Sequence, residues 1–353
     1  MAGTPGSATM EELGCYLLAG AAADPSAIGE EARAAETLGF GTAFISERFN
    51  VKESMTLSGA ATAVTSSLQI ATAATNHNTR HPLVTASAAM TLHRMGGGRF
   101  TLGLGRGIDV IFDMSAIPRI TTAQMEDFTG LMKRLWRGEA VVGHDGPAGA
   151  WPLLALGSEF DDHIPVLLCA FGPNSLALAG RCFDAVVLHT FFTDETTRRA
   201  VETVRTAAEL AGRDPDDVEV WSCFATVGDH LDEDVRLRKT VGRMATYLQG
   251  YGDLLVRTND WNPALLERFR ADPTVGQFLS AIDANATTAQ LEAIAEVVPG
   301  EWLAPSGTGS PAQCAAAVRA QFDLGVSGVI MHGCTPSELA PVVEQYRTIR
   351  GLQ

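Results

Sequence analysis

The chain has 353 residues, of which 46% are hydrophobic and 19% charged, a balance typical of a folded globular protein. Its formal net charge of -15 argues against a nucleic acid or an anionic membrane as partner. No apolar run approaches the roughly 20 residues of a membrane span. Residues 1–10 lack the basic start and hydrophobic core of a signal peptide, so we expect a flexible tail there.

One pattern recurs along the chain: a helical segment ends in glycine, and a short apolar segment typical of a strand follows. Glycine suits the left-handed backbone conformation that closes many helices. Alternation of this kind favours a parallel sheet covered by helices. The glycines that end these segments are Gly39, Gly180, Gly212 and Gly325.

The apolar segments predict eight strands that alternate with helices. We therefore expect a single (β/α)8 TIM barrel over residues 11–353, with a doubly wound open sheet as the rival fold. In either fold the chemistry lies at the carboxyl ends of the strands. The predicted strands cover residues 13–18, 42–46, 68–75, part of 96–107, 165–169, 184–188, 218–227 and 328–332.

Several helices between these strands are marked by their caps and apolar faces. Asp24 with Pro25 begins the first, and Ser310 with Pro311 begins one near the end of the chain. In the helix at 83–95, four apolar residues share one face: Val84, Ala88, Leu92 and Met95. In the helix at 121–137, we expect an apolar stripe to pack into the core: Met125, Phe128, Met132, Leu135 and Trp136.

Three segments do not fit the simple alternation. Residues 108–118 are irregular with at most a short turn, and 142–163 is rich in glycine and proline, which predicts an inserted loop or lid. The segment from about 231 to 300 is helical and longer than one crossover needs, so we expect a helical excursion from the barrel.

Six cysteines lie far apart without a C-x-x-C pair. Buried reduced thiols in a cytoplasmic protein are the favoured interpretation, over disulfides or a metal site.

A glycine-rich exit, Gly103-Leu-Gly-Arg-Gly107, follows the fourth predicted strand. A dinucleotide fingerprint requires G-x-G-x-x-G running directly into a helix, and here the third glycine comes one residue early. We favour a close backbone approach to a flat ligand, with Arg106 near an anion or a ring edge. The alternative is a tight turn of the barrel.

The segment Ala170-Phe-Gly-Pro-Asn-Ser175 joins the fifth strand to a helix. Free backbone N–H groups and the helix dipole bind phosphate at such a position. The segment therefore predicts a phosphate site, with an ordinary capped helix start as the alternative.

Other polar residues at the strand exits are candidates for chemistry. His77 and His81 have a spacing that holds metals on helices, but Pro82 follows and no third ligand is evident, so we predict no metal. A polar pocket wall and a solvated loop both remain open for that segment. The candidate proton-transfer groups are Glu47, His77, Asp109 and His189, of which Glu47 and His189 are the best placed.

In order along the chain, a set of motifs resembles the luciferase-like superfamily, most closely its oxidoreductases that depend on coenzyme F420. The motifs are Phe44-Ile-Ser-Glu-Arg-Phe49, Thr75-Asn-His-Asn-Thr-Arg-His-Pro82, the glycine-rich segment 97–107, Leu135-Trp-Arg-Gly138, 165–173, and the closing segments 309–311 and 324–330. The resemblance implies a (β/α)8 barrel that binds FMN or the deazaflavin coenzyme F420 at the strand exits, and a homodimer.

The resemblance also implies cofactor contacts in this chain. It places a strand bulge with a non-prolyl cis peptide between Thr72 and Ala73, behind the ring of the cofactor. The implied cofactor-binding residues are Thr72, Ala73, Thr75, Gly105, Arg106, Gly107, Ala170, Phe171, Gly172 and Pro173, and His189 falls on a substrate-pocket position.

Two positions depart from the family's sugar-phosphate dehydrogenases. Arg48 stands where those enzymes carry a catalytic histidine, and Ile108 stands where they carry an acidic proton donor. That substrate class is therefore disfavoured. Arg106 matches a phosphate-contacting arginine of the flavin luciferases, which keeps FMN as an alternative cofactor.

We therefore expect an F420-dependent oxidoreductase that transfers hydride between the deazaflavin and a small organic substrate. Glu47 or His189 would handle the substrate proton, and Arg48 would orient an anionic or carbonyl oxygen. One alternative is an FMN-dependent monooxygenase that uses O₂ and a separate reductase. Another is a barrel that binds a flavin without catalysis.

Overall fold

The computed structural model describes residues 9–20, 24–49 and 51–351. The tail predicted for residues 1–10 lies largely outside this range. Met10 does not belong to a tail, because it is fully buried and begins the first strand.

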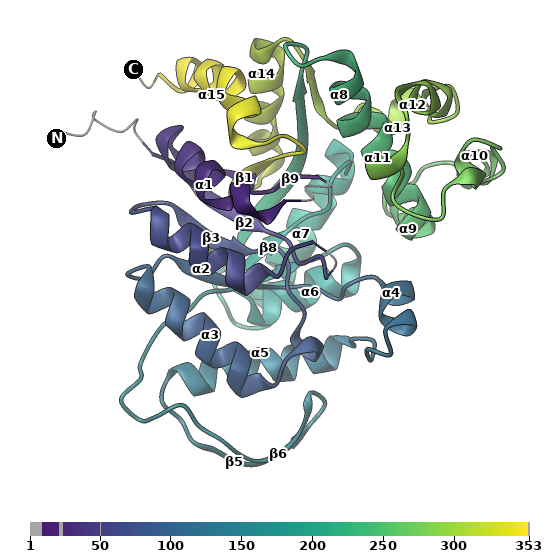
Figure 1. Ribbon diagram of the computed structural model, residues 1–353. Coiled ribbons are helices and arrows are strands. Elements are labelled where there is room, and N and C mark those ends of the chain that lie inside the picture. Colours follow the sequence, from purple (N-terminus) through teal and green to yellow (C-terminus); the bar gives the residue numbers. More distant parts are fainter. Residues whose placement is uncertain (1–8, 21–23, 50, 352–353) are drawn as a thin grey trace.

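Eight parallel strands close into a barrel, as predicted (Figure 1). Around the barrel their order is β1, β2, β3, β4, β7, β8, β9 and β11, and β11 pairs with β1 to complete the ring. Their bounds are β1 Met10–Tyr16, β2 Phe40–Ile45, β3 Gln69–Thr72, β4 Phe100–Leu104, β7 Val166–Cys169, β8 Ala185–Val187, β9 Glu219–Gly228 and β11 Gly328–His332. A short strand, β10 (Gly307–Gly309), pairs in parallel with the carboxyl-terminal end of β9.

Helices surround the barrel, and caps expected from the sequence begin several of them. Asp24 accepts a hydrogen bond from the N–H of Ser26, and Ser310 forms a capping box with Gln313. The helices of the ring are α1 Ile28–Thr37, α2 Ser54–Val64, α3 Pro82–Met95, α5 Thr122–Trp136, α6 Pro173–Cys182, α7 Asp194–Leu210, α14 Pro311–Gln321 and α15 Pro336–Arg350 (Figure 1).

The packing of α5 confirms its predicted stripe, since all five of the residues named above are buried. Of the four apolar residues named for α3, Leu92 is buried in the core and Ala88 packs against it, but the other two are not buried. Val84 and Met95 are more than half exposed, and the buried face instead carries Thr85, Ala86 and Ala89. Small residues let α3 approach its neighbours closely, so in this helix the largest apolar side chains do not mark the inner face.

The segment predicted as an inserted loop is an antiparallel hairpin, β5 (Val141–Gly146) and β6 (Gly149–Leu154). Asp127 of α5 fixes its turn by accepting hydrogen bonds from the His144 ring and the N–H of Ala148. In Figure 1 it extends below α3 and α5. None of its residues lines the cavity described below, so a lid role for this segment stays a prediction.

The segment predicted as a helical excursion contains six α-helices among its described residues. Its helices are α8 Glu233–Leu237, α9 Arg243–Thr258, α10 Pro263–Arg270, α11 Ile282–Asn285, α12 Thr288–Ala295 and α13 Gly300–Leu303. They gather around a hydrophobic cluster of their own, which includes Met244, Leu248, Leu255 and Trp302. The excursion and the short helix α4 (Asp109–Met114) lie on the same side of the barrel in Figure 1. Both contribute residues to the cavity at the strand exits.

Each of the six cysteines is a free thiol and is buried or half-buried, as expected from their spacing. Burial raises the pKa of the Cys182 and Cys314 thiols to about 11, which keeps both protonated at neutral pH. Within the described ranges, no helix has the length and apolar character needed to cross a membrane.

Candidate active site

A cavity of about 570 Å³ opens at the carboxyl ends of the barrel strands. Its wall contains residues that follow seven of the eight barrel strands, together with residues of α4 and α9. The residues that carry the following argument are Tyr16, Glu47, Ala73, Ala74, Asn76, Gly105, Arg106, Phe171, Ser175, His189, Tyr247, Tyr251 and His332. The strand exits therefore converge on one site, as a TIM barrel requires.

The wall after β3 is a bulge of small residues. The N–H of Ala73 donates to the carbonyl of Ile45 (2.8 Å), and the carbonyl of Ala74 accepts from the N–H of Glu47 (3.1 Å). The cis peptide lies between Ala73 and Ala74, one residue later than the predicted Thr72–Ala73 bond. The predicted position was wrong because β3 keeps regular pairing with β2 through Thr72.

Two predicted cofactor residues, Thr72 and Thr75, lie behind this wall. Both are fully buried, and neither lines the cavity. The hydroxyl of Thr72 bonds to both backbone groups of Gly103 (2.7 and 2.8 Å), where a Cβ would collide with the Thr72 carbonyl oxygen. Their roles are to hold β4 against β3 and to position Glu47, while Ala73 and Ala74 form the surface.

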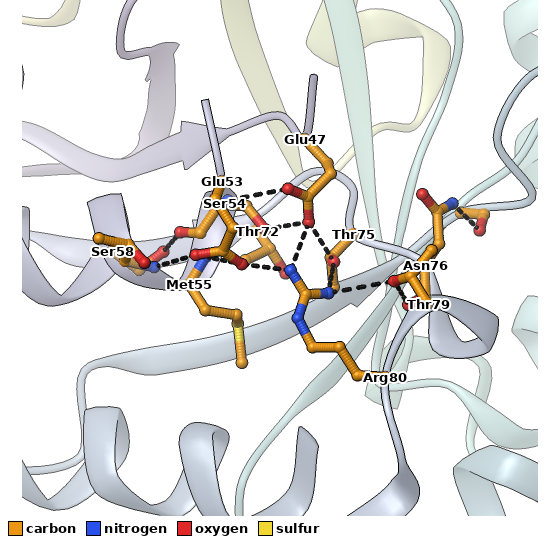
Figure 2. A network of polar contacts seen from close by, with 12 residues as sticks. Glu47, Glu53, Ser54, Met55, Ser58, Thr72, Thr75, Asn76, Thr79 and Arg80 are labelled. Atoms are coloured by element: carbon orange, nitrogen blue, oxygen red, sulfur yellow. Dashed lines mark hydrogen bonds and ion pairs between the residues drawn. The ribbon is translucent and has the colours of Figure 1, made fainter. Parts of the chain in front are cut away.

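The Glu47 carboxylate is held in a dense polar network (Figure 2). Its Oε2 accepts hydrogen bonds from Arg80 Nη2 (2.8 Å), the Thr75 hydroxyl (2.7 Å) and the Ser54 hydroxyl (3.0 Å). Its Oε1 accepts from the N–H of Ser54 (3.2 Å). Arg80 also pairs with Glu53. Because four donors are directed at it, this carboxylate is held in one orientation and acts as a positioning group.

The glycine-rich exit of β4 forms the wall beside Ala74. A Cβ on Gly105 would lie 2.8 Å from the Cβ of Ala74, so glycine keeps this surface flat. Arg106 does not extend into the cavity as a free cation. Its guanidinium donates to the carbonyl of Ile120 (3.1 Å) and to the hydroxyl of Thr122, which ties the loop to the start of α5. Gly107 has φ +73°, and the ring of Phe112 occupies the place of its missing side chain.

The predicted phosphate segment is at the start of α6. Gly172 is the N-cap and Pro173 the first helical residue, and no side chain caps this end. Ala170, Phe171 and Ser175 line the cavity, so the helix start faces it. Uncapped N–H groups and the positive end of the helix dipole make this position suitable for an anion.

On the opposite side of the cavity, His189 and Tyr251 form a half-buried pair. The Nδ1 of His189 lies 2.9 Å from the carbonyl oxygen of Thr190, which only accepts, so Nδ1 carries the proton. In the neutral ring Nε2 then accepts from the Tyr251 hydroxyl (2.8 Å). Burial lowers the pKa of His189 to about 4, so the ring is neutral at pH 7. Any proton relay from His189 must therefore run through Tyr251.

His77 and His81 do not act together. His77 is buried and stacks on Phe128, with ring centroids 5.0 Å apart, whereas His81 caps α3 by accepting from the N–H of Leu83 (3.2 Å). Asn76 between the strand and these histidines donates to the carbonyl of Gly105 (2.8 Å). In this segment Asn76 thus contributes to the cavity wall, and His81 belongs to the start of α3. Among the described residues, no three metal-binding side chains cluster.

Several site residues did not emerge from the sequence. Arg80 is one, because its two carboxylate partners come from a different loop. Tyr16 donates to the carbonyl of Ala73 (3.2 Å) from the end of β1. Tyr247 and Tyr251 come from α9, whose helix is interrupted at Tyr251. Their spacing of four residues was the only sequence signal that they share one helix face.

Comparison with known proteins places this architecture in a family. The family model described as luciferase-like monooxygenase matches residues 6–328. This chain belongs to the luciferase-like monooxygenase family. The resemblance expected from its motifs is thereby confirmed, and so is the barrel fold.

Luciferase-like proteins of known activity and structure resemble this chain over most of its length. A 5,10-methylenetetrahydromethanopterin reductase of Methanolobus tindarius is 26% identical over 311 residues, which cover 86% of this chain and 89% of the relative. The structure of the coenzyme F420-dependent tetrahydromethanopterin reductase from Methanopyrus kandleri has a TM-score of 0.79 and 21% identity, and covers 99% of this chain and 100% of that one.

A second structure that resembles this chain is that of an F420-dependent secondary alcohol dehydrogenase in complex with an F420–acetone adduct. It has a TM-score of 0.68 and 16% identity, and covers 96% of this chain and 98% of that one. At these identities the two structures show that the fold is shared.

Proposed function

We propose that this protein is a coenzyme F420-dependent oxidoreductase that transfers hydride between the deazaflavin and a small organic substrate. The observation that carries the proposal is the match along most of the chain to a 5,10-methylenetetrahydromethanopterin reductase. The barrel shared with an F420-dependent reductase supports it as well.

The residues of the cavity fit this cofactor. Ala73, Ala74 and Gly105 present a surface without large side chains, which suits the face of a flat ring. The uncapped start of α6 at Gly172 and Pro173 suits a phosphate group. When bound, the coenzyme supplies the hydride chemistry, and the protein supplies binding and orientation.

The proposed roles of the three candidate catalytic residues now differ. Glu47 keeps the exit of β3 in place through Arg80 and Thr75, because its oxygens are already bonded. His189 orients the Tyr251 hydroxyl by accepting its proton in a hydrogen bond, so at pH 7 the Tyr251 oxygen is available to accept a hydrogen bond from the substrate. Arg48 does not line the cavity itself, and its predicted role in orienting an anionic or carbonyl oxygen remains a proposal. The homodimer and the cytoplasmic location remain predictions.

An FMN-dependent monooxygenase is the second candidate, since the family model itself carries that description. A single-turnover assay with the full-length protein distinguishes the F420-dependent oxidoreductase from the FMN-dependent monooxygenase. Reduced F420 is mixed anaerobically with a panel of small carbonyl compounds, and reduced FMN is mixed with O₂ and the same compounds. Consumption of reduced F420 that depends on an acceptor supports the proposal. If product forms only with reduced FMN and O₂, the monooxygenase function replaces the proposal. If the protein binds a cofactor but turns over none of the compounds, it is a non-catalytic flavin-binding barrel.

A further inference from the structure

Three cationic side chains gather beside the part of the cavity that follows β1, β2 and β11. Arg48 and Lys52 belong to one short loop after β2, closed by reciprocal backbone hydrogen bonds of 3.0 and 2.8 Å. Arg243 begins α9 in the excursion and is only 4% exposed. Two segments far apart in the sequence thus bring their cations together.

Among the described residues, two of these three side chains have polar partners and Arg48 has none. Arg243 Nη2 pairs with Asp283 (2.7 Å), and Lys52 Nζ donates to the carbonyl of Leu18 (2.6 Å) near the carboxylate of Glu31. In the part of the chain that the structure describes, the Arg48 guanidinium makes no hydrogen bond or ion pair. Two carboxylates, Asp283 and Glu31, therefore face two arginines and a lysine that is only partly charged at neutral pH, because its pKa is about 7.

This excess charge is costly because the groups are partly withdrawn from water. Burial and the neighbouring Arg48 lower the pKa of Lys52 to about 7, and burial together with Arg243 lowers the pKa of Arg48. Like charges at a desolvated site repel each other unless an opposite charge joins them. An anion bound here would remove that repulsion.

The cluster acts on the cavity through two of its wall residues. The Arg243 guanidinium lies 5.7 Å from the ring centre of Tyr247. His332, at the end of β11, lines the cavity, and its buried Nδ1 has no partner among the described residues. Burial and then the charges of Arg243, Arg48 and Lys52 lower the pKa of His332 well below its usual value. The positive field of the cluster therefore reaches the cavity.

The position of the cluster separates it from the predicted cofactor phosphate site. Around the barrel, β11 lies opposite β4, and the loop after β4 carries the flat wall at Gly105. The strands next to the cluster, β2 and β11, are each three strands away from β7, which leads into α6. A ring lying on the Ala73–Gly105 surface would leave its other face toward His332 and Tyr247. A substrate would enter on that face.

We propose that Arg48, with Lys52 and Arg243 behind His332 and Tyr247, binds an oxyanion group of the substrate, a carboxylate or a phosphate. The inference rests on the proposed function and specifies its substrate class. Arginine suits this role because its planar fork of donors matches both oxyanions.

The test uses the full-length protein, with and without coenzyme F420, and calorimetric titration with succinate, inorganic phosphate and neutral succinamide. Wild type is expected to bind one or both anions and not the amide, and the stronger anion identifies the group. Arg48→Gln is expected to weaken anion binding at least about tenfold, and Arg48→Lys to restore part of it. The matched control Arg134→Gln removes an exposed cation and should leave anion binding unchanged.

Coenzyme F420 affinity, followed by fluorescence in the same variants, distinguishes the two proposals. It is expected to change less than about twofold in Arg48→Gln, well below one tenfold step of affinity. Equal anion binding by wild type and Arg48→Gln, or no anion binding at millimolar concentrations, would overturn the oxyanion site. A parallel loss of F420 affinity would reassign the cluster to the cofactor. Anion binding that depends on Arg48 in a protein that binds no F420 would retain the site and reject the proposed function.

Discussion

The two halves of the cavity wall differ in how their polar groups are satisfied. After β3 and β4 the wall is made of small residues, and the charged groups behind it are matched, with Glu47 accepting four hydrogen bonds. After β11 and along α9 the wall is aromatic, and an unmatched cation, Arg48, lies behind it with Arg243. A matched network holds a fixed surface, whereas an unmatched charge is available to a ligand. On this difference rests our proposal that the first half binds the cofactor and the second half binds the substrate.

The largest expected effect comes from breaking the matched network. Arg80→Ala leaves the Glu47 carboxylate buried without its cation, which is expected to cost about 3 kcal/mol in the free energy of unfolding. Denaturant unfolding measures this loss. The control Arg319→Ala removes an exposed pair with Asp323 and should cost less than about 1 kcal/mol. Equal losses in the two variants would show that the network is not a rigid support.

The acid stability of the fold should depend on His77, which lies behind the β3–β4 half. Burial lowers its pKa to about 4, while the unfolded value is about 6.5. The unfolded chain therefore takes up the proton first, and stability is lost as the pH falls from about 6.5 to about 4. His77→Gln should reduce that loss by on the order of 2 kcal/mol in unfolding curves measured across this range.

The matched control for that experiment is His163→Gln, because His163 is exposed. It should leave the pH dependence of stability as in wild type. A His77→Gln variant with an unchanged slope would mean that the buried ring does not differ from the unfolded chain in its protonation.

A smaller effect is expected from filling the flat surface. In Gly105→Val the new side chain would contact Ala74 and project over the ring-binding surface. Affinity for coenzyme F420 should fall at least about tenfold, or about 1.4 kcal/mol, in a fluorescence titration. Gly130→Ala, on the exposed side of α5, is the control. Unchanged affinity in Gly105→Val would place the ring elsewhere in the cavity.

The same two halves differ in how far sequence could predict them. The β3–β4 half was predicted because short motifs at strand exits carry it: the glycines at 103–107 and the small residues around Ala73. The cis peptide was misplaced by one residue because local sequence does not specify where pairing with β2 ends. The exposed face of α3 was missed because small residues, and not large apolar ones, mark its buried side.

The α9 half could not be assembled from sequence. Tyr247, Tyr251 and Arg243 lie in a long helical segment, and only its docking against the barrel brings them to His189 and His332. Arg80 was missed for a related reason, since nothing in its own segment indicates the partners Glu47 and Glu53. Local patterns therefore predicted the elements and the strand exits, and long-range contacts determined which side chains meet there.

The central claim is tested most directly by titrating the purified full-length protein with coenzyme F420 and, separately, with FMN, following fluorescence. The account predicts saturable binding of F420 and much weaker binding of FMN. Tight binding of FMN alone would contradict it and move the protein to the oxygen-dependent monooxygenases. Binding of neither compound would leave the barrel as described and remove the cofactor assignment of the β3–β4 half.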